Sequence, residues 1–346
     1  EWVRAEGLAA DVREYGRWIR DEAERRIGHL YPKITAPGGT EHTVIAWKWA
    51  RTVRSPNPAN PIETPLVNSW WLSKKKGKEA WVRAAVENGK IRYEVVHSAD
   101  GPIGDDDGTV GRKGAISLVD GTPIDFAYMR SEACSGQMGA HLIAVVAESD
   151  KGRVYISPDA QQENIALVNS PDNLPDSALP QKALGFRVQA YGYTRWSDLF
   201  TNRQLVALTT LSDLVGEARE KVFADALAAG MPEGERLEKG DTGAASYADA
   251  VATYLALAVS RTTDYSNANA TWDSTRDSAT HMFTRQAIPM IWSFVEVNPF
   301  SDSSGNFLGQ LRWIVKVLNK LLVSPPGYAD QVSASARNYE SLVVST

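Results

Sequence analysis

A short basic run contains the residues of this sequence that are best suited to bind phosphate groups. The segment Ser73-Lys74-Lys75-Lys76-Gly77-Lys78 follows two tryptophans, Trp70 and Trp71. Lysine side chains neutralise phosphates, and aromatic rings stack on nucleotide bases. A solvated charged loop that precedes a hairpin is the alternative interpretation. The candidate DNA-binding residues are Lys74, Lys75, Lys76 and Lys78, with Arg51 and Arg54 on a strand upstream.

The tripeptide Asn298-Pro299-Phe300 is a second candidate for chemistry on a nucleotide base. Enzymes that methylate amino groups hold a flipped base with an Asn/Asp-Pro-Pro-aromatic turn, whereas only one proline is present here. A helix stop followed by the polar loop 301–306 is the alternative. The sequence has no phosphate-binding loop, dinucleotide-binding glycine motif, nucleophile elbow or zinc-protease helix. We therefore assign no catalytic residue to this chain.

The cysteine and histidine content argues against a metal site. Cys134 is the single cysteine, and a disulfide or a thiolate zinc cage needs at least two sulfur atoms. The 5 histidines include no pair spaced four residues apart. The formal net charge of -5 also argues against a generally basic surface, so any DNA contact must be local.

The length of 346 residues and the hydrophobic content of 43% predict a globular chain with two structural units. No segment approaches the roughly 18 uninterrupted apolar residues of a membrane span. The start of the chain, Glu1-Trp2, has neither an initiator methionine nor an apolar signal segment. These features predict a cytoplasmic location without membrane contact, and suggest that residues precede Glu1.

The first half of the chain is predicted to be mostly extended. An amphipathic helix over residues 8–27 comes first, and residues 43–53 are rich in β-branched and aromatic side chains. Asn88-Gly89 predicts a hairpin between strands 78–86 and 91–97. Two further strands are expected at residues 141–147 and 153–156. The layout is a leading helix in residues 1–32 and a β-rich unit in residues 33–157.

The second half is predicted to be mostly helical. Ser157-Pro158 indicates the start of a short helix, and residues 158–195 form this helix and a linker. Thr201 and Gln204 have capping-box spacing at the start of a long helix that ends before Gly230. Further helices are expected at residues 246–259, 278–297 with a kink at Pro289, and 308–322. The helical region spans residues 196–325, and residues 326–346 form a tail with a terminal strand at 342–344.

Several motifs run in order along nearly the whole chain, at residues 26–32, 43–53, 71–78, 136–148, 153–155, 198–210 and 298–306. Together they resemble the large adenine-specific DNA methylases that carry a zinc-ribbon insert, a family often found among phage-defence genes. The resemblance implies an α+β segment, with a β-rich insert followed by a helical region, from the middle of a larger α/β Rossmann-like methyltransferase.

The resemblance also identifies two turns as the knuckles of a zinc ribbon. Zinc-bearing members of the family have Cys-Pro-Asn-Pro-Ala-Cys in the first turn and Cys-x-x-Cys-Gly in the second. The four ligand positions here hold Ser55, Asn60, Ser117 and Asp120, so every thiolate is replaced. One carboxylate with neutral oxygens is a poor zinc site. The resemblance therefore implies a degenerate, metal-free ribbon held by side-chain hydrogen bonds and packing.

The family resemblance implies that the chemistry lies elsewhere in the enzyme. An S-adenosylmethionine-binding motif is expected before Glu1, and a catalytic Asp-Pro-Pro-Tyr turn after Thr346, so this chain itself would hold no cofactor. We expect a segment that positions DNA, with DNA and the remaining parts of the methylase or other defence-system proteins as partners. A noncatalytic DNA-binding or assembly subunit of a phage-defence complex is the alternative.

Overall fold

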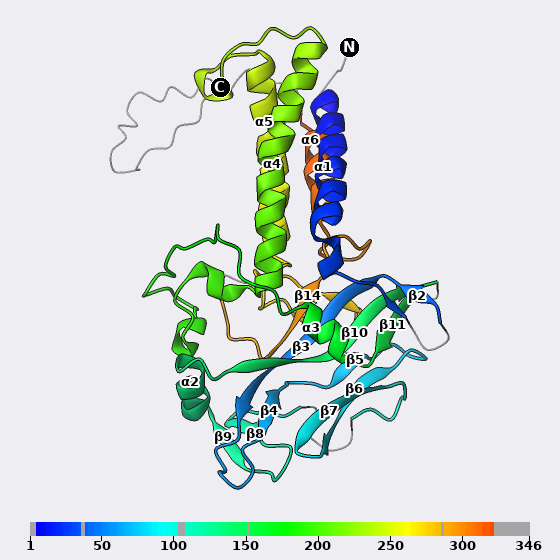
Figure 1. Cartoon of the computed structure of the whole chain (residues 1–346), viewed down its shortest axis with the longest axis vertical. Coiled ribbons are helices and arrows are strands. Elements are labelled where there is room, and N and C mark those ends of the chain that lie inside the picture. The colour runs from blue at the N-terminus through cyan, green and yellow to red at the C-terminus, as the bar shows by residue number, and fades with distance from the viewer. Residues whose placement is uncertain (1–4, 36–38, 103–107, 151, 285–286, 322–346) are drawn as a thin grey trace, which may run out of the picture.

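The structure is a computed structural model that describes residues 5–35, 39–102, 108–150, 152–284 and 287–321. It is mixed α+β, with several antiparallel sheets and six α-helices in these ranges. Figure 1 shows that the long helices stand on a β-rich base. None of the described helices combines the length and apolar composition needed to cross a bilayer.

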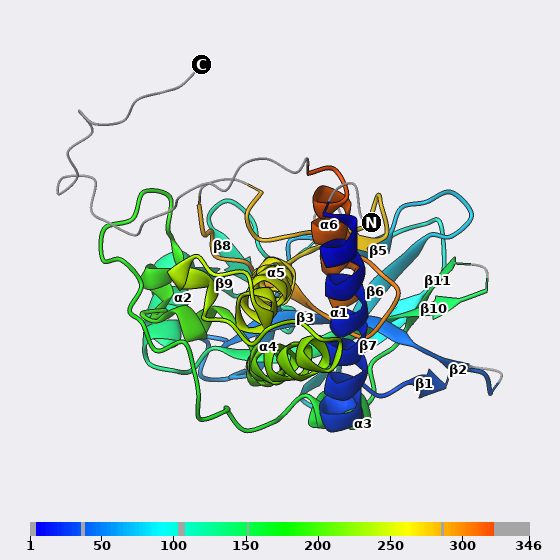
Figure 2. The same ribbon diagram turned by 90° about the horizontal axis from the view of Figure 1, so that it is seen from above.

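The four long helices form an up-and-down bundle. They are α1 (Glu6–Ile27), α4 (Asn202–Ala228), α5 (Ala244–Thr263) and α6 (Phe307–Leu318). Seen from above, α1 lies beside α6, and α4 lies beside α5 (Figure 2). One face of each helix is apolar, and these faces share a single core. Burial of this apolar surface is the main favourable contribution to the stability of the bundle.

Helices α1 and α6 approach each other closely at Gly16. A Cβ atom at this position would lie 2.2 Å from Cδ2 of Leu311. Glycine inside a helix costs about 1 kcal/mol relative to alanine. Close packing of the two helices offsets this cost, and it is possible because Gly16 has no side chain.

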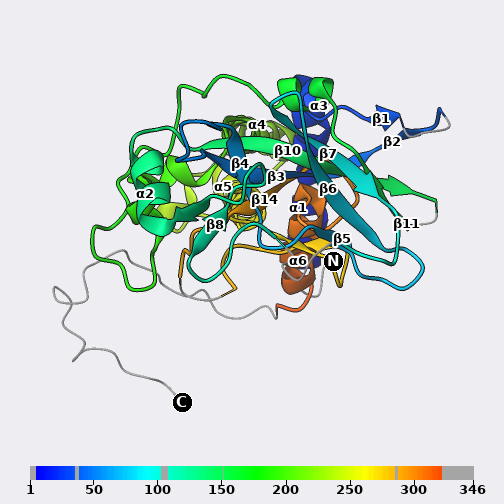
Figure 3. The same ribbon diagram turned by 90° about the horizontal axis from the view of Figure 1, so that it is seen from below.

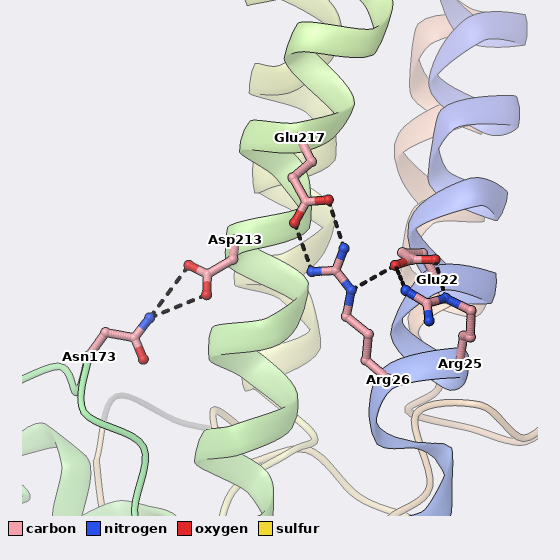
Figure 4. A network of polar contacts seen from close by, with 6 residues as sticks. All are labelled: Glu22, Arg25, Arg26, Asn173, Asp213 and Glu217. Carbon is pink, nitrogen blue, oxygen red and sulfur yellow. Dashed lines mark hydrogen bonds and ion pairs between the residues drawn. The ribbon is translucent and has the colours of Figure 1, made fainter.

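Polar contacts fasten the outer face of α1 to α4. The two Nη atoms of Arg26 donate to the carboxylate of Glu217 at 2.7 Å each, and Nε donates to Glu22 at 2.7 Å (Figure 4). Asn173 contacts Asp213 of α4 in the same view, at 3.4 Å. Such exposed pairs contribute at most about 1 kcal/mol each, so they orient the helices more than they stabilise them.

The base is built around a five-stranded antiparallel sheet in which β3 is central. Its order is β11-β10-β3-β14, and β4 pairs with β3 at the edge that β14 also uses. The strands are β3 (Val44–Arg54), β4 (Glu63–Leu66), β10 (Gly139–Ser149), β11 (Gly152–Ile156) and β14 (Ser293–Val297).

Strand β3 is covered on both faces, and Arg54 is its single exposed residue. Trp47 and Trp49 face the bundle core, whereas Ile45 and Ala50 face a second apolar core. This second core lies between the central sheet and the three-stranded sheet β5-β6-β7. Those strands are β5 (Trp71–Ser73), β6 (Ala80–Glu87) and β7 (Lys90–Val96). The continuous apolar run in β3 is what burial on both faces requires.

Smaller elements complete the base, and Figure 3 shows it from the side away from the bundle. Three two-stranded sheets pair β1 with β2, β8 with β9, and β12 with β13. Their bounds, with those of two short helices, are β1 (Ile34–Thr35), β2 (Glu41–His42), β8 (Gly114–Ile116), β9 (Pro123–Asp125), β12 (Trp272–Asp273), β13 (Ser278–Ala279), α2 (Phe126–Cys134) and α3 (Ala160–Ile165).

Most elements predicted from periodicity and turn chemistry are confirmed. The predicted hairpin is β6–β7, and Asn88 and Gly89 at its turn have φ values of 51° and 73°. At the start of α4, Thr201 and Gln204 form both hydrogen bonds of a capping box. The helices predicted at residues 8–27, 246–259 and 308–322 correspond to α1, α5 and α6.

The helix predicted over residues 278–297 is wrong. This segment holds β13 and β14, and β14 pairs with β3 along residues 46–50. Its apolar side chains contribute to the two cores on either face of the sheet, with Phe294 in one and Val295 in the other. Tertiary pairing thus overrides the helical periodicity. The central sheet therefore takes strands from both the segment predicted as β-rich and the segment predicted as helical.

Two further predictions concern the start of α3 and the tail of the chain. The N-cap of the short helix α3 is Asp159, whose carboxylate accepts from the N–H of Gln162, rather than Ser157. The predicted tail 326–346 and its terminal strand lie outside the described residues.

Candidate nucleic-acid interface

The basic run between β5 and β6 forms an exposed turn with a defined backbone. The N–H of Lys78 donates to the carbonyl oxygen of Lys75 at 2.9 Å, and Gly77 has a φ of 76°. A positive φ at the third position is typical of a type II turn, and glycine adopts it without strain. Lys74, Lys76 and Lys78 are exposed on this turn. We call residues 74–78 the lysine turn.

Contacts with the β12–β13 hairpin hold the lysine turn in place. The Nζ atom of Lys75 lies 3.0 Å from a carboxylate oxygen of Asp277 and donates to the carbonyl oxygen of Arg276 at 3.1 Å. The N–H of Lys74 donates to the carbonyl oxygen of Ser274 at 2.8 Å. Lys75 therefore anchors the turn, and the other lysines are presented on a fixed backbone.

An aromatic ring lies beside the lysine turn. The ammonium group of Lys74 is 5.3 Å from the centroid of the Trp71 ring, which remains partly exposed. On the other side of the turn, Lys78 lies near Gly152 in the turn between β10 and β11. A cationic turn next to an indole ring can hold a phosphate and stack a base.

Arg51 does not belong to this surface, which corrects the prediction that it contacts DNA. Its side chain is buried, and its guanidinium donates to the carbonyl oxygens of Ile291 and Ala268 at 2.9 and 3.0 Å. It also lies over the rings of Tyr193 and Phe294. Burial lowers the pKa of Arg51. Its donors are used inside the protein, so no phosphate can reach them.

Arg54 is exposed but lies at the other end of β3 from the lysine turn. It pairs with Glu63 at the last position of the strand. The first residue of β3, Val44, pairs with Ala147, close to the β10–β11 turn that Lys78 approaches. The two ends of this strand are roughly 33 Å apart. Arg54 and the lysine turn therefore do not form one compact site.

The structure brings together the two turns that the family resemblance identifies as ribbon knuckles. Asn57 and Asn60 of the first turn both donate to the same carboxylate oxygen of Asp120 in the second turn, at 2.7 and 3.1 Å. The carboxylate also accepts from the N–H of Thr122 at 3.1 Å. Hydrogen bonds from Thr122, Asn60 and Asn57 lower the pKa of Asp120 below its ordinary value.

The two turns also share a local hydrogen-bond pattern. Ser55 and Ser117 are both buried, at 3% and 2% exposure. Each hydroxyl oxygen accepts the backbone N–H two residues later, from Asn57 and Val119 respectively, at 3.3 Å. Each serine N–H donates across its own loop, to Ile62 or Thr122. In these two turns, hydrogen bonds occupy the groups that stand at the ligand positions.

The side chains at the four ribbon positions do not fit a zinc ion. They offer one carboxylate, one amide and two hydroxyls, and the carboxylate already accepts three hydrogen bonds. Across the described residues, no group of three or more His, Cys, Asp or Glu side chains is placed to hold a metal ion.

The loop at Asn298 is used inside the protein. Nδ2 of Asn298 donates to the carbonyl oxygen of Val44 at 2.8 Å, and Oδ1 accepts the N–H of Phe300 at 2.9 Å. The ring of Phe300 packs against Tyr31, with centroids 5.4 Å apart. The amide and the ring that a flipped base would need are therefore buried in the junction between the sheet and the bundle.

Sequence reasoning missed a basic groove between α1 and α6. A cavity of 310 Å³ there is lined by Arg13, Arg17, Arg312 and Lys316, among others. Arg17 pairs with Glu14, whereas Arg312 has no ion pair with any residue that the structure describes. The i, i+4 spacing of the basic residues on each helix is the signal that would have identified it.

Sequence reasoning also missed a polar chain in a cavity of 840 Å³ beside β7. Nε2 of His141 lies 3.1 Å from Glu63, and Nδ1 lies 3.2 Å from the hydroxyl of Tyr93. Burial, with a further contribution from Glu163 and Glu63, raises the pKa of Tyr93. The tyrosine is therefore neutral at physiological pH, which disfavours a nucleophilic role. No local sequence signal links residues this far apart.

Comparisons with protein-family models, with curated proteins and with solved structures found no match for this chain.

Proposed function

We propose that this chain positions DNA as an internal segment of an S-adenosylmethionine-dependent DNA adenine N6-methyltransferase. The observation that carries the proposal is the lysine turn, which presents Lys74, Lys76 and Lys78 beside Trp71 on a backbone anchored by Lys75. Phosphate contacts from such a turn fix the register of a protein on DNA without reading its sequence. The turn lies within one of the motifs that resemble the methylase family.

The two hydrogen-bonded turns support the same proposal. Asp120 joins them where a zinc ion joins the knuckles of a zinc ribbon, so the side chains present can keep the turns together without metal. In this proposal the segment is a β-rich insert with a degenerate ribbon, followed by helices, within a Rossmann-like enzyme. S-adenosylmethionine would supply the methyl group at a site in the rest of that enzyme. We place the protein in the cytoplasm.

The DNA contact is tested by removing charge at the lysine turn. The variant Lys74→Ala/Lys76→Ala/Lys78→Ala keeps Lys75, so the anchor to Asp277 is retained. We expect its affinity for a short duplex, measured by fluorescence anisotropy, to fall at least about tenfold at low salt. The matched control removes three exposed lysines elsewhere, in Lys113→Ala/Lys182→Ala/Lys239→Ala. Equal losses in the two variants would contradict a local contact.

The methylase assignment is tested by activity and by genetic context. The purified chain is expected to transfer no methyl group from S-adenosylmethionine to DNA, because it contributes no catalytic residue in this proposal. Methyl transfer by the chain alone would contradict the assignment. Methylase motifs in frame on both sides of the coding region would support it. Native stop signals there would favour a noncatalytic DNA-binding or assembly subunit of a phage-defence complex.

The ribbon interpretation is tested with metal. Elemental analysis of the purified protein should find no stoichiometric zinc. Replacing all four ligand positions with cysteine, in Ser55→Cys/Asn60→Cys/Ser117→Cys/Asp120→Cys, should create a site that binds one zinc ion tightly. Failure of the folded quadruple variant to bind zinc would show that the two turns do not have ribbon geometry.

A further inference from the structure

Helix α6, which lies at the outer edge of the bundle beside α1, presents a row of large apolar side chains to solvent (Figure 2). Trp313, Val317 and Leu321 are 55%, 58% and 42% exposed, and their four-residue spacing places them on one face. The N–H of Leu321 donates to the carbonyl oxygen of Val317 at 3.2 Å, so the row continues along the helical path. Elsewhere in the described chain, exposed large apolar residues occur singly along the sequence. An exposed apolar row with polar neighbours is typical of an interaction surface.

A row of basic side chains runs beside the apolar row. Arg312, Lys316 and Lys320 have the same four-residue spacing and are all exposed. Arg13 and Arg17 of α1 line the groove between the two helices from its other side. Helix α6 contains no acidic residue, although the chain as a whole carries a net charge of -5. The positive charge is therefore local, and it complements an acidic partner. We call the basic and apolar rows of α6 together the α6 face.

A continuous hollow joins the two rows. The groove of 310 Å³ between α1 and α6 has the buried side chains of Leu311 and Val315 among its lining. A second, shallow hollow of 610 Å³ extends over the apolar row, and Lys316 and Asn319 line both hollows. An apolar side chain that enters the groove therefore meets aliphatic groups, while carboxylates beside it meet cations at the rim.

The cations at this rim are available to a partner. Arg13, Arg312 and Lys320 form no ion pair with any residue that the structure describes. The ammonium group of Lys316 lies 4.5 Å from the centroid of the Trp313 ring, which links the basic row to the apolar row. Exposed ion pairs add little affinity, so the cations select and orient the partner, and the apolar row supplies most of the binding energy.

We propose that the α6 face docks an acidic amphipathic helix of a protein partner. The apolar row extends about 12 Å, which is two helical turns and suits contact with one further helix. Apolar residues of the partner pack on this row, and its carboxylates pair with the basic rim. A second copy of this chain does not fit, because a two-fold contact would bring two positive faces together. The α6 face belongs to the bundle and the lysine turn to the base, so the proposal does not depend on the DNA contact (Figure 1).

The test titrates the full chain into a labelled synthetic peptide, with fluorescence anisotropy as the readout. The probe is an acidic peptide of about 20 residues, long enough to form a helix, with leucines at three- and four-residue spacing and glutamates on the other face. We expect it to bind, and Trp313→Ala to weaken binding at least about tenfold. Arg312→Glu/Lys316→Glu should weaken binding at least as much, because it places like charges at the contact.

Two variants away from the α6 face serve as matched controls. Leu184→Ala removes another exposed apolar side chain, and Lys113→Glu/Lys182→Glu makes the same change in charge at exposed positions outside the bundle. Neither should alter the affinity for the acidic peptide. Equal losses in the controls and in the α6 variants would overturn the proposal.

A charge exchange separates this contact from general attraction. A second peptide with lysine in place of every glutamate should not bind the unaltered chain, and should gain affinity for Arg312→Glu/Lys316→Glu. No binding of the acidic peptide up to millimolar concentration, or equal binding of both peptides to the unaltered chain, would overturn the proposal. Tighter binding of phosphatidylserine vesicles or duplex DNA than of the peptide, lost in the same α6 variants, would overturn it in favour of a membrane or nucleic acid. If an α6 variant does not fold, the comparison of the two peptides on the unaltered chain still decides.

Discussion

The exposed lysine turn and the buried cations beside β3 show how differently basic side chains can be used within a single chain. Lys74 and Lys78 lie on the surface, whereas Lys48, Arg51 and Arg203 are buried in the sheet and its junction with the bundle. The buried guanidiniums have carbonyl, carboxylate or aromatic partners. The buried cations therefore belong to the core of the fold, whereas those of the lysine turn remain on the surface.

The strongest expected effect comes from breaking the buried pair between Arg203 and Glu296. Arg203→Met leaves an uncompensated carboxylate, and we expect the free energy of unfolding to fall by about 3–5 kcal/mol. Arg203→Met/Glu296→Leu should recover much of this loss in urea denaturation. The control, Arg83→Met, breaks the exposed pair with Glu94 and should cost at most about 1 kcal/mol. Similar losses in the two single variants would remove the contrast between buried and exposed cations.

The buried cation Lys48 should make the stability of the protein depend on pH. Burial lowers its pKa from 10.5 to about 8, and its Nζ donates to the carbonyl oxygen of Trp71 at 3.4 Å. The unfolded chain therefore binds more protons between pH 8 and 10.5, so stability should rise with pH across that window. Lys48→Met should abolish this rise and stabilise the protein at pH 7 by on the order of 3 kcal/mol. Thermal melts at several pH values measure both effects.

Gly77 tests whether the shape of the lysine turn matters as well as its charge. Gly77→Ala forces a side chain into a φ of 76°, which costs roughly 1–2 kcal/mol although no atom lies within 4 Å of the new Cβ. We expect a lower melting temperature and weaker DNA binding with all lysines present. Gly111→Ala is the control, because that glycine has equal space and no positive φ. Unchanged DNA affinity in Gly77→Ala would show that charge alone suffices.

The smallest expected change in stability comes from removing the Asp120 carboxylate at the ribbon turns. The pKa of Asp120 lies below its ordinary value because Thr122 and the two asparagines donate to its carboxylate. Its contribution to stability is therefore complete at neutral pH and is lost only as the pH falls well below 4. Asp120→Ala should lower the melting temperature slightly at pH 7, and the difference from the unaltered protein should shrink in acid. A difference that grows in acid would contradict this account.

Local elements could be predicted from the sequence far better than the arrangement of the sites. Asn88-Gly89 and the capping residues Thr201 and Gln204 act over a few residues, so their signals survive in a single sequence. The strand β14 could not be predicted, because its conformation depends on pairing with a strand more than two hundred residues away.

The same limit explains the errors in the predicted site. Arg51 and Lys74 are equally basic in the sequence, and only the packing of β14 against β3 buries one of them. The family resemblance, rather than spacing, led us to expect side-chain hydrogen bonds at the ribbon turns, and the structure shows Asn60 donating to Asp120. The cavity beside β7 was not predicted at all, because its lining comes from segments far apart in the chain.

The salt dependence of DNA binding tests the central claim most directly. Each lysine that contacts a phosphate contributes about 0.9 to the slope of log affinity against log salt concentration. The slope for Lys74→Ala/Lys76→Ala/Lys78→Ala should therefore be smaller than that of the unaltered chain by about 2–3. The Lys113→Ala/Lys182→Ala/Lys239→Ala control should keep the original slope. Identical slopes for all three proteins would contradict a DNA contact at the lysine turn.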